Sequence, residues 1–209
     1  MTFRGWPAEA VEFYDGLEAD NSKVYWQRHR AVYDSCVRGP MEQLLNELTG
    51  EFGSGKIFRP YRDVRFSADK TPYKTNCAAT LGSGVAPRYI SFSADGLSVG
   101  GGLYMPDPAA LARYRTAVDR DKSGAELAAI VGVLHKAGYD TMAHEVLKTA
   151  PRGVDKDHPR IGLLRHKGLA VMKSWPVGAW LGTARAKDRI VAALRDGNPL
   201  IAWLDHNVG

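Results

Sequence analysis

The stretch that decides the fold lies near the middle of the chain, where residues 88–105 read RYISFSADGLSVGGGLYM. It contains two β-rich segments, over 88–94 and 97–105. Asp95 and Gly96 stand between them, and Asp-Gly is the pair favoured at a type I′ hairpin turn. The stretch therefore predicts two strands that are antiparallel neighbours.

Further short segments of the same kind lie on both sides of this hairpin, and Gly, Pro and Ser separate them. They predict strands near 57–59, 64–66, 75–81 and 169–175. The segments before the hairpin, together with it, predict a curved, mainly antiparallel sheet over about 57–105, and 169–175 is expected as a further strand.

Apolar residues at spacings of three and four predict helices in the rest of the chain. Those helices are expected over 7–17, 23–36, 40–48, 107–118, 123–138, 157–168 and 184–203, with the last one interrupted at 197–199. Asp107 followed by Pro108 is typical of a helix N-cap, and Ser123 with Glu126 matches a capping box. The sequence is therefore helical on both sides of the predicted sheet.

The order of these elements indicates an α+β fold in which N-terminal and C-terminal helices pack on the sheet. The chain is expected to be helical over 6–50, sheet-rich over 56–106 and helical over 107–206. It contains no internal repeat, low-complexity tract or linker between domains. Its 209 residues are therefore expected to form a single domain over 1–209.

The composition, with 44% hydrophobic and 24% charged residues, is typical of a soluble globular protein. No apolar run approaches the ~18 residues of a membrane span, and Arg4, Glu9 and Glu12 interrupt any signal-peptide region. Cys36 and Cys77 have no Cys-x-x-Cys spacing, so we expect two buried thiols rather than a disulfide framework or a zinc site. The expected location is the cytoplasm.

Positive charge is concentrated in two segments, although the net charge is only +5. Six basic and two acidic residues lie over 56–74, and seven basic and two acidic residues lie over 148–173. Two basic segments on an otherwise near-neutral chain fit a local anion site better than a protein that coats nucleic acid. The alternative is that both segments are solvated loops.

The first basic segment also carries a long motif. The motif consists of Phe58 to Ser67, Asp69-Lys70, Pro72 to Thr75, Gly100 to Pro106, Pro151 to Gly153 and Asp157 to Pro159. Through it, residues 3–205 resemble the microbial family called domain of unknown function 2461, or DUF2461. The resemblance implies one compact domain and a shared importance of the motif positions, and it brings no established reaction, ligand or catalytic residue. The chain departs mildly from the family's pattern at 178–186 and at Cys77.

The segment from Arg59 to Thr75 is the strongest candidate for a functional site. If 59–66 is extended, alternation places Asp63 on one face between Arg59 and Arg65. Arginines bind phosphate and carboxylate groups through paired hydrogen bonds, and Asp63 would hold the guanidinium groups in place. The predicted anion contacts here are Arg59, Tyr61, Arg62, Arg65, Lys70, Lys74 and Thr75. The alternative is that Asp63 pairs with an arginine only to tie a loop to the sheet.

Asp63 and His158 are the candidate proton-transfer groups. His158 precedes Pro159 at a predicted helix start, where the helix dipole favours the neutral imidazole; helix capping or loop packing is the alternative role. Arg165 and Lys167, at the end of the same helix, are further candidate ligand contacts. The sequence shows no spacing typical of metal ligands and no phosphate-binding glycine motif, so we expect neither a metal nor a cofactor.

The sequence thus predicts a protein that binds or acts on a phosphate- or carboxylate-bearing small molecule, with a nucleotide as one candidate. One alternative is a nucleic-acid-binding module, in which the two basic segments form a continuous stripe. Another is a protein-interaction module whose basic face meets an acidic partner. The sequence names no reaction and leaves open whether the protein is an enzyme.

Overall fold

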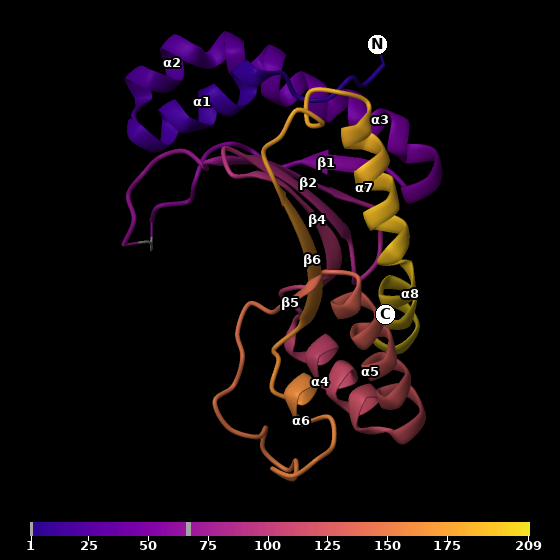
Figure 1. Cartoon of the computed structure of the whole chain (residues 1–209). Coiled ribbons are helices and arrows are strands. Elements are labelled where there is room, and N and C mark those ends of the chain that lie inside the picture. The colour runs from indigo at the N-terminus through magenta and orange to yellow at the C-terminus, as the bar shows by residue number, and fades with distance from the viewer. Residues whose placement is uncertain (1, 66–67) are drawn as a thin grey trace. The chain divides into compact units, whose positions relative to one another are not determined.

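The computed structural model describes residues 2–65 and 68–209 (Figure 1). Over these residues the fold is α+β, as the sequence predicts, with helices toward both ends of the chain and a six-stranded antiparallel sheet. The strands follow one another across the sheet in the order β1-β2-β3-β4-β6-β5. They are β1 (Gly55–Ile57), β2 (Asn76–Leu81), β3 (Arg88–Ser93), β4 (Gly96–Leu103), β5 (Asp140–Met142) and β6 (Leu169–Pro176).

Helices make up most of the remaining described chain. They are α1 (Ala8–Ala19), α2 (Lys23–Val32), the π-helix η1 (Tyr33–Arg38), α3 (Gly39–Phe52), α4 (Pro108–Asp119), α5 (Asp121–Lys136), α6 (Ile161–Leu164), α7 (Arg185–Asp196) and α8 (Asn198–Val208). Among the described residues, no helix combines the length and the apolar character needed to cross a membrane.

The chain divides into two compact units. The first unit comprises Met1–Gly82, Tyr89–Ser98 and Ser174–Ala192, and the second comprises Ser83–Arg88, Val99–Lys173 and Ala193–Gly209. Strands β3, β4 and β6 and helix α7 each contribute residues to both units. The single domain expected over 1–209 stays a prediction.

The first unit starts with a helical run that is longer than the sequence suggested. The Ser22 side chain accepts a hydrogen bond from the Tyr25 backbone N–H at 3.1 Å and caps α2. From there α2, η1 and α3 follow one another without a gap, whereas separate helices over 23–36 and 40–48 were expected. The prediction was wrong because Pro40 directly follows the π-helical turn, in which the Gly39 N–H donates to the Asp34 carbonyl oxygen five residues earlier, and the run continues past the proline.

One face of the first unit's strands forms its core. The Trp6 ring stacks on Phe92 of β3, with ring centroids 5.0 Å apart, and the Tyr14 ring of α1 lies 5.9 Å from Phe92. Ile90, two residues before Phe92, is buried on the same face. The residues that alternate with these two are only half-buried, so the opposite face of β3 is not packed in the core.

The predicted hairpin is confirmed, with β3 and β4 as neighbours in the sheet. Its turn differs from the expected type I′, because among the described residues only glycines have positive φ, and Asp95 is therefore excluded from that conformation. Gly96 has a φ of 130°, and a Cβ added to it would lie 2.2 Å from the Trp175 carbonyl oxygen. Glycine is thus required at this position by both its conformation and its close neighbour.

In the second unit, α4 and α5 lie side by side and α8 packs against both (Figure 1). The Asp107 side chain accepts a hydrogen bond from Ala110 N–H at 2.7 Å, which confirms the predicted cap of α4. The capping box at Ser123 is wrong: α5 already begins at Asp121, and the Ser123 hydroxyl donates to the Ala117 carbonyl oxygen at 2.6 Å.

Two expectations about strands need correction, and one strand was missed. The strand expected near 57–59 is β1, which ends at Ile57. Val64 and Arg65 lie outside any strand, and Phe66, the end of the strand expected over 64–66, lies outside the described residues. Strand β5 was not expected, since three residues with one half-buried side chain leave no readable alternation.

Candidate functional site

Residues 58–75, here called the arm, connect β1 to β2 and carry most of the predicted site. Two parts of the arm pair with each other: Tyr61 and Tyr73 form an antiparallel bridge. The Arg62 N–H donates to the Pro72 carbonyl oxygen at 2.9 Å, and the Lys74 N–H donates to the Pro60 carbonyl oxygen at 2.8 Å. The root of the arm is therefore a short two-stranded ribbon with a fixed register.

Aromatic packing anchors the ribbon to the first unit. The Tyr73 ring stacks on Trp26 of α2, with centroids 4.3 Å apart, and Tyr61 lies 5.4 Å from Tyr73. Asn21 bonds to both backbone groups of Tyr73, donating to its carbonyl oxygen at 3.1 Å and accepting from its N–H at 3.0 Å. Tyr61, a predicted ligand contact, is 44% exposed at the margin of this aromatic cluster.

The register brings two predicted cations together. Paired residues of a ribbon share a face and successive residues alternate, so Arg62 and Lys74 lie on the face opposite Tyr61 and Tyr73. Because Arg62 pairs with Pro72, Lys74 is its diagonal cross-strand neighbour. Long side chains at such positions reach each other.

The positive charge of Arg59, the residue after Phe58, also acts on Lys74. Burial lowers the pKa of Lys74, and the nearby positive charges of Arg59 and Arg62 lower it further. The Lys74 ammonium also lies 5.4 Å from the centre of the Phe58 ring. Arg59, Arg62 and Lys74 are hereafter called the cation cluster.

Within the cluster, Arg62 has partners of its own. Its guanidinium forms an ion pair with Asp69 and donates to the Thr71 hydroxyl at 2.8 Å. The N–H and hydroxyl of Thr71 donate to Asp69 at 2.9 and 2.7 Å, and these bonds, with Arg62, hold the pKa of Asp69 below its usual range. Asp69 and Thr71 therefore orient Arg62, a role the sequence analysis had given to Asp63.

Asp63 binds a single arginine rather than bridging two. Its carboxylate accepts two hydrogen bonds from the Arg65 guanidinium, at 2.9 and 2.7 Å, and both side chains are exposed. These bonds, with a smaller effect from Arg59, lower the pKa of Asp63. A carboxylate with a lowered pKa is a weak proton acceptor at neutral pH, so this geometry gives no support to a catalytic Asp63.

The two remaining predicted ligand contacts of the arm are Lys70 and Thr75. The Lys70 ammonium donates to the Val64 carbonyl oxygen at 2.9 Å, which ties together the distal part of the arm. Thr75 is half-buried directly before β2.

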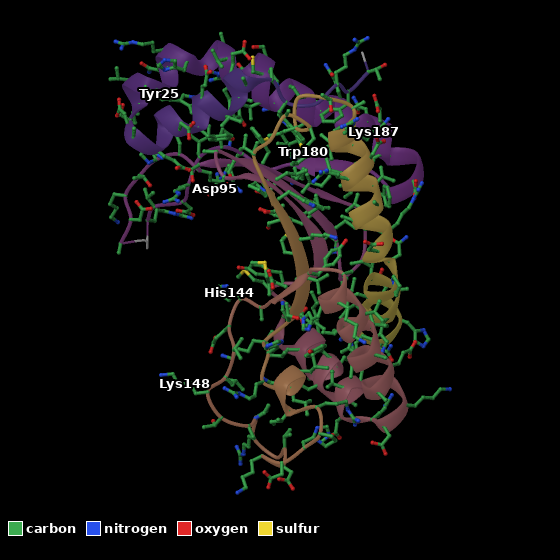
Figure 2. The ribbon with its side chains drawn as sticks, in the orientation of Figure 1. Tyr25, Asp95, His144, Lys148, Trp180 and Lys187 are labelled. Atoms are coloured by element: carbon green, nitrogen blue, oxygen red, sulfur yellow. The ribbon has the colours of Figure 1, made fainter. Side chains whose placement is uncertain are left out.

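The predicted residues of the second basic segment belong to the second unit, where they stabilise a long loop. The Arg165 guanidinium donates to the Leu147 carbonyl oxygen at 2.6 Å, and Lys167 forms an ion pair with Glu145 at 2.7 Å. Lys148, labelled in Figure 2, is exposed. Arg165 and Lys167 are thus engaged in contacts within the protein.

His158 has a packing role in the same loop region. Its Nδ1 accepts a hydrogen bond from the Arg160 N–H at 3.0 Å, and its Nε2 lies 3.5 Å from the Asp119 carboxylate. The side chain is 14% exposed. The helix expected to start at 157 begins only at Ile161, so His158 is not in its first turn. This environment matches the alternative of loop packing that the sequence analysis left open.

One feature near the cation cluster was not singled out from the sequence. The rings of Phe58 and Tyr89 lie with their centroids 6.3 Å apart, and Phe58 is next to Lys74 of the cation cluster. A single aromatic residue in a sequence does not indicate whether its ring will be exposed, so neither ring was identified. Over residues 2–65 and 68–209, no group of three or more His, Cys, Asp or Glu side chains is arranged to hold a metal ion.

Comparison with known proteins adds a family to this geometry. A family model described as a conserved hypothetical protein, DUF2461, matches residues 9–203. Comparisons with curated proteins and with solved structures gave no match. The family match spans nearly the whole chain and includes the arm, in agreement with the motif between Phe58 and Thr75. The chain therefore belongs to the DUF2461 family of conserved hypothetical proteins.

Proposed function

We propose that the protein binds the phosphate or carboxylate group of a small molecule through the cation cluster, Arg59, Arg62 and Lys74. The observation that supports this function is the register of the ribbon, which places Arg62 and Lys74 on one face at the root of the arm, with Arg59 near enough for its charge to act on Lys74. Lys74 is half-buried there, with no carboxylate within ion-pair distance of its ammonium among the described residues. Like charges held together raise the energy of the free protein, and a bound anion offsets that repulsion.

The cluster also has the geometry to orient an anion. Asp69 and Thr71 hold the Arg62 guanidinium in place, which reduces the side-chain entropy lost when a ligand binds. The arginines supply paired donors and Lys74 supplies a compact charge.

The arrangement of the second basic segment favours a small ligand over a long nucleic acid. Arg160, Arg165 and Lys167 are engaged in hydrogen bonds or ion pairs within the second unit. Cations held in this way contribute less to a continuous stripe along a phosphate backbone. A phosphorylated or acidic small-molecule partner and a cytoplasmic location are parts of this proposal.

The test is the binding of inorganic pyrophosphate, measured by calorimetry at fixed salt. We expect Lys74→Ala and Arg62→Ala each to weaken binding about tenfold, because each removes a charge-assisted hydrogen bond. Lys136→Ala is the matched control, since it removes an exposed positive charge from α5 in the second unit. Circular dichroism and urea midpoints establish that the variants are folded.

Equal pyrophosphate affinity in the wild type, the control and the folded Arg62→Ala/Lys74→Ala double variant would place the anion site elsewhere. The salt dependence provides a second criterion. Two or three ion contacts give a shallow decrease of affinity with salt, whereas about six phosphate contacts give a decrease of several decades per decade of salt.

A further inference from the structure

Two aromatic rings beside the cation cluster are not explained by anion binding. Phe58 is 38% exposed at the root of the arm, where its N–H donates to the Ala78 carbonyl oxygen of β2 at 2.8 Å. Its ring lies 6.3 Å from that of Tyr89 on β3, at an interplanar angle of 39°. Tyr89 is half-buried. Phe58 is therefore open to solvent and Tyr89 is partly so, although large aromatic side chains are usually covered in a core.

The rings belong to the face of the first unit's strands that lies opposite the core. Tyr89 and Ser91 alternate with buried Ile90 and Phe92, and the Asn76 amide donates to the Ser91 hydroxyl at 2.8 Å. On this face, hereafter called the open face, Ser98 and Ser174 also share a hydrogen bond of 2.8 Å. The open face thus presents hydroxyl and amide groups beside two aromatic rings.

Lys74 connects the open face to the cation cluster. Its ammonium lies 5.4 Å from the centre of the Phe58 ring and is close enough to Arg59 and Arg62 for their charges to act on it. An anion bound at Lys74 is therefore adjacent to the Phe58 ring. A ligand that carries both a phosphate and an aromatic ring could occupy both at once.

We propose that the small molecule is a nucleotide, whose phosphate binds Arg59, Arg62 and Lys74 while its base packs against Phe58 and Tyr89. This inference rests on the proposed function and adds the class of ligand. Inorganic anions and sugar phosphates would use the cations and leave the rings unused. Stacking on an aromatic side chain tolerates every base, so the geometry selects nucleotides as a class.

The experiment compares ligands that differ only in the base, using the full chain. Calorimetry measures the dissociation constants of 5′-AMP, 5′-GMP, 5′-UMP and ribose 5-phosphate for the wild type, Phe58→Leu and Tyr89→Leu. We expect at least one nucleotide to bind about tenfold more tightly than ribose 5-phosphate. Phe58→Leu should raise the dissociation constant of that nucleotide about tenfold, because leucine keeps the apolar contact and loses the aromatic face. The dissociation constant of ribose 5-phosphate should change by less than about twofold. Tyr104→Leu, which removes an exposed ring from the second unit, is the matched control.

The outcomes separate this inference from the proposed function. Two results would refute the nucleotide as the ligand without refuting the anion site. One is that ribose 5-phosphate binds as tightly as every nucleotide, and the other is that nucleotide affinity is unchanged in both folded ring variants. Absence of binding by pyrophosphate, ribose 5-phosphate and all nucleotides would overturn both. An oligothymidylate of eight nucleotides serves as a further probe. If it binds more than tenfold more tightly than any mononucleotide and its affinity falls steeply with salt, the ligand is single-stranded nucleic acid and the mononucleotide proposal is refuted.

Discussion

At the scale of single residues, the site depends on the register of the ribbon in the arm, which could not be predicted from the sequence. Arg62 and Lys74 are both visible as cations in the sequence, but only the pairing of Tyr61 with Tyr73 brings them to one face of the ribbon. Likewise, the sequence alone does not show which arginine pairs with Asp63 and which pairs with Asp69. The fold pairs Asp69 with Arg62 and leaves Asp63 to Arg65. Candidate residues could therefore be named from composition, whereas their partners required the backbone geometry.

Glycine substitutions give a prediction at this scale. Gly96→Ala should lower the free energy of unfolding by more than about 2 kcal/mol, because its φ of 130° strains alanine and the new Cβ would meet the Trp175 carbonyl oxygen. Gly132→Ala is the control: no atom lies within 4 Å of the added Cβ in the middle of α5, so it should stabilise the protein by about 0.5–1 kcal/mol. Urea unfolding followed by circular dichroism measures both. Equal effects of the two substitutions would mean that β4 and β6 do not approach closely at Gly96.

At the scale of elements, the sequence predicted those whose signals are local. The Asp107 cap, the β3–β4 hairpin and β6 all follow from a short run of neighbouring residues. The continuous helical run over 23–52 was missed, because the proline at its interior junction suggests a break. The capping box failed for a related reason: Ser123 has the right spacing, but its hydroxyl donates to a carbonyl oxygen of the preceding helix.

Glu47 offers a prediction about how elements of the first unit are held together. From α3, its carboxylate accepts from the Phe3 N–H at 2.7 Å and from the Lys187 ammonium of α7 at 2.6 Å. The bond from Lys187, followed by that from Phe3, lowers the pKa of Glu47 below its ordinary value of 4.5. Glu47→Gln should therefore cost about 1 kcal/mol of stability at pH 7.

The pH dependence of that cost follows from the direction of the shift. The folded carboxyl stays ionised at a lower pH than the unfolded one, so its contribution is complete above about pH 4.5 and is lost as the pH falls through the folded pKa. Urea unfolding of wild type and Glu47→Gln over this range should give stability curves that converge in acid. Glu12→Gln, on the exposed face of α1, serves as the control. A constant difference at every pH would assign the loss to packing rather than to the charge.

At the scale of the whole molecule, the division of secondary structure between the two units matters for unfolding. Strands β3, β4 and β6 and helix α7 each have residues in both units. Half of a hydrogen-bonded strand is costly to unfold alone, because its backbone partners lose their hydrogen bonds. The expected consequence is cooperative unfolding of both units, in keeping with the predicted single domain.

Calorimetry tests this expectation. We expect one thermal transition in which the calorimetric and van't Hoff enthalpies agree. The tryptophans provide independent probes. A Trp203→Phe variant reports on the first unit, which contains the other four, Trp6, Trp26, Trp175 and Trp180, and the difference from the wild type reports on Trp203 of the second unit. Two separated transitions, each seen by the tryptophans of one unit, would instead establish two independently folding domains.

The two marginal strands of the sheet have a consequence for the behaviour of the protein at high concentration. Over the described residues, β1 and β5 are the outermost strands, and each contains only three residues. The free backbone groups of an edge strand can pair with another polypeptide. Edge strands of three residues offer few such groups, and the exposed charged side chain of Lys56 on β1 further disfavours pairing. We therefore expect the folded protein to resist edge-to-edge aggregation at high concentration.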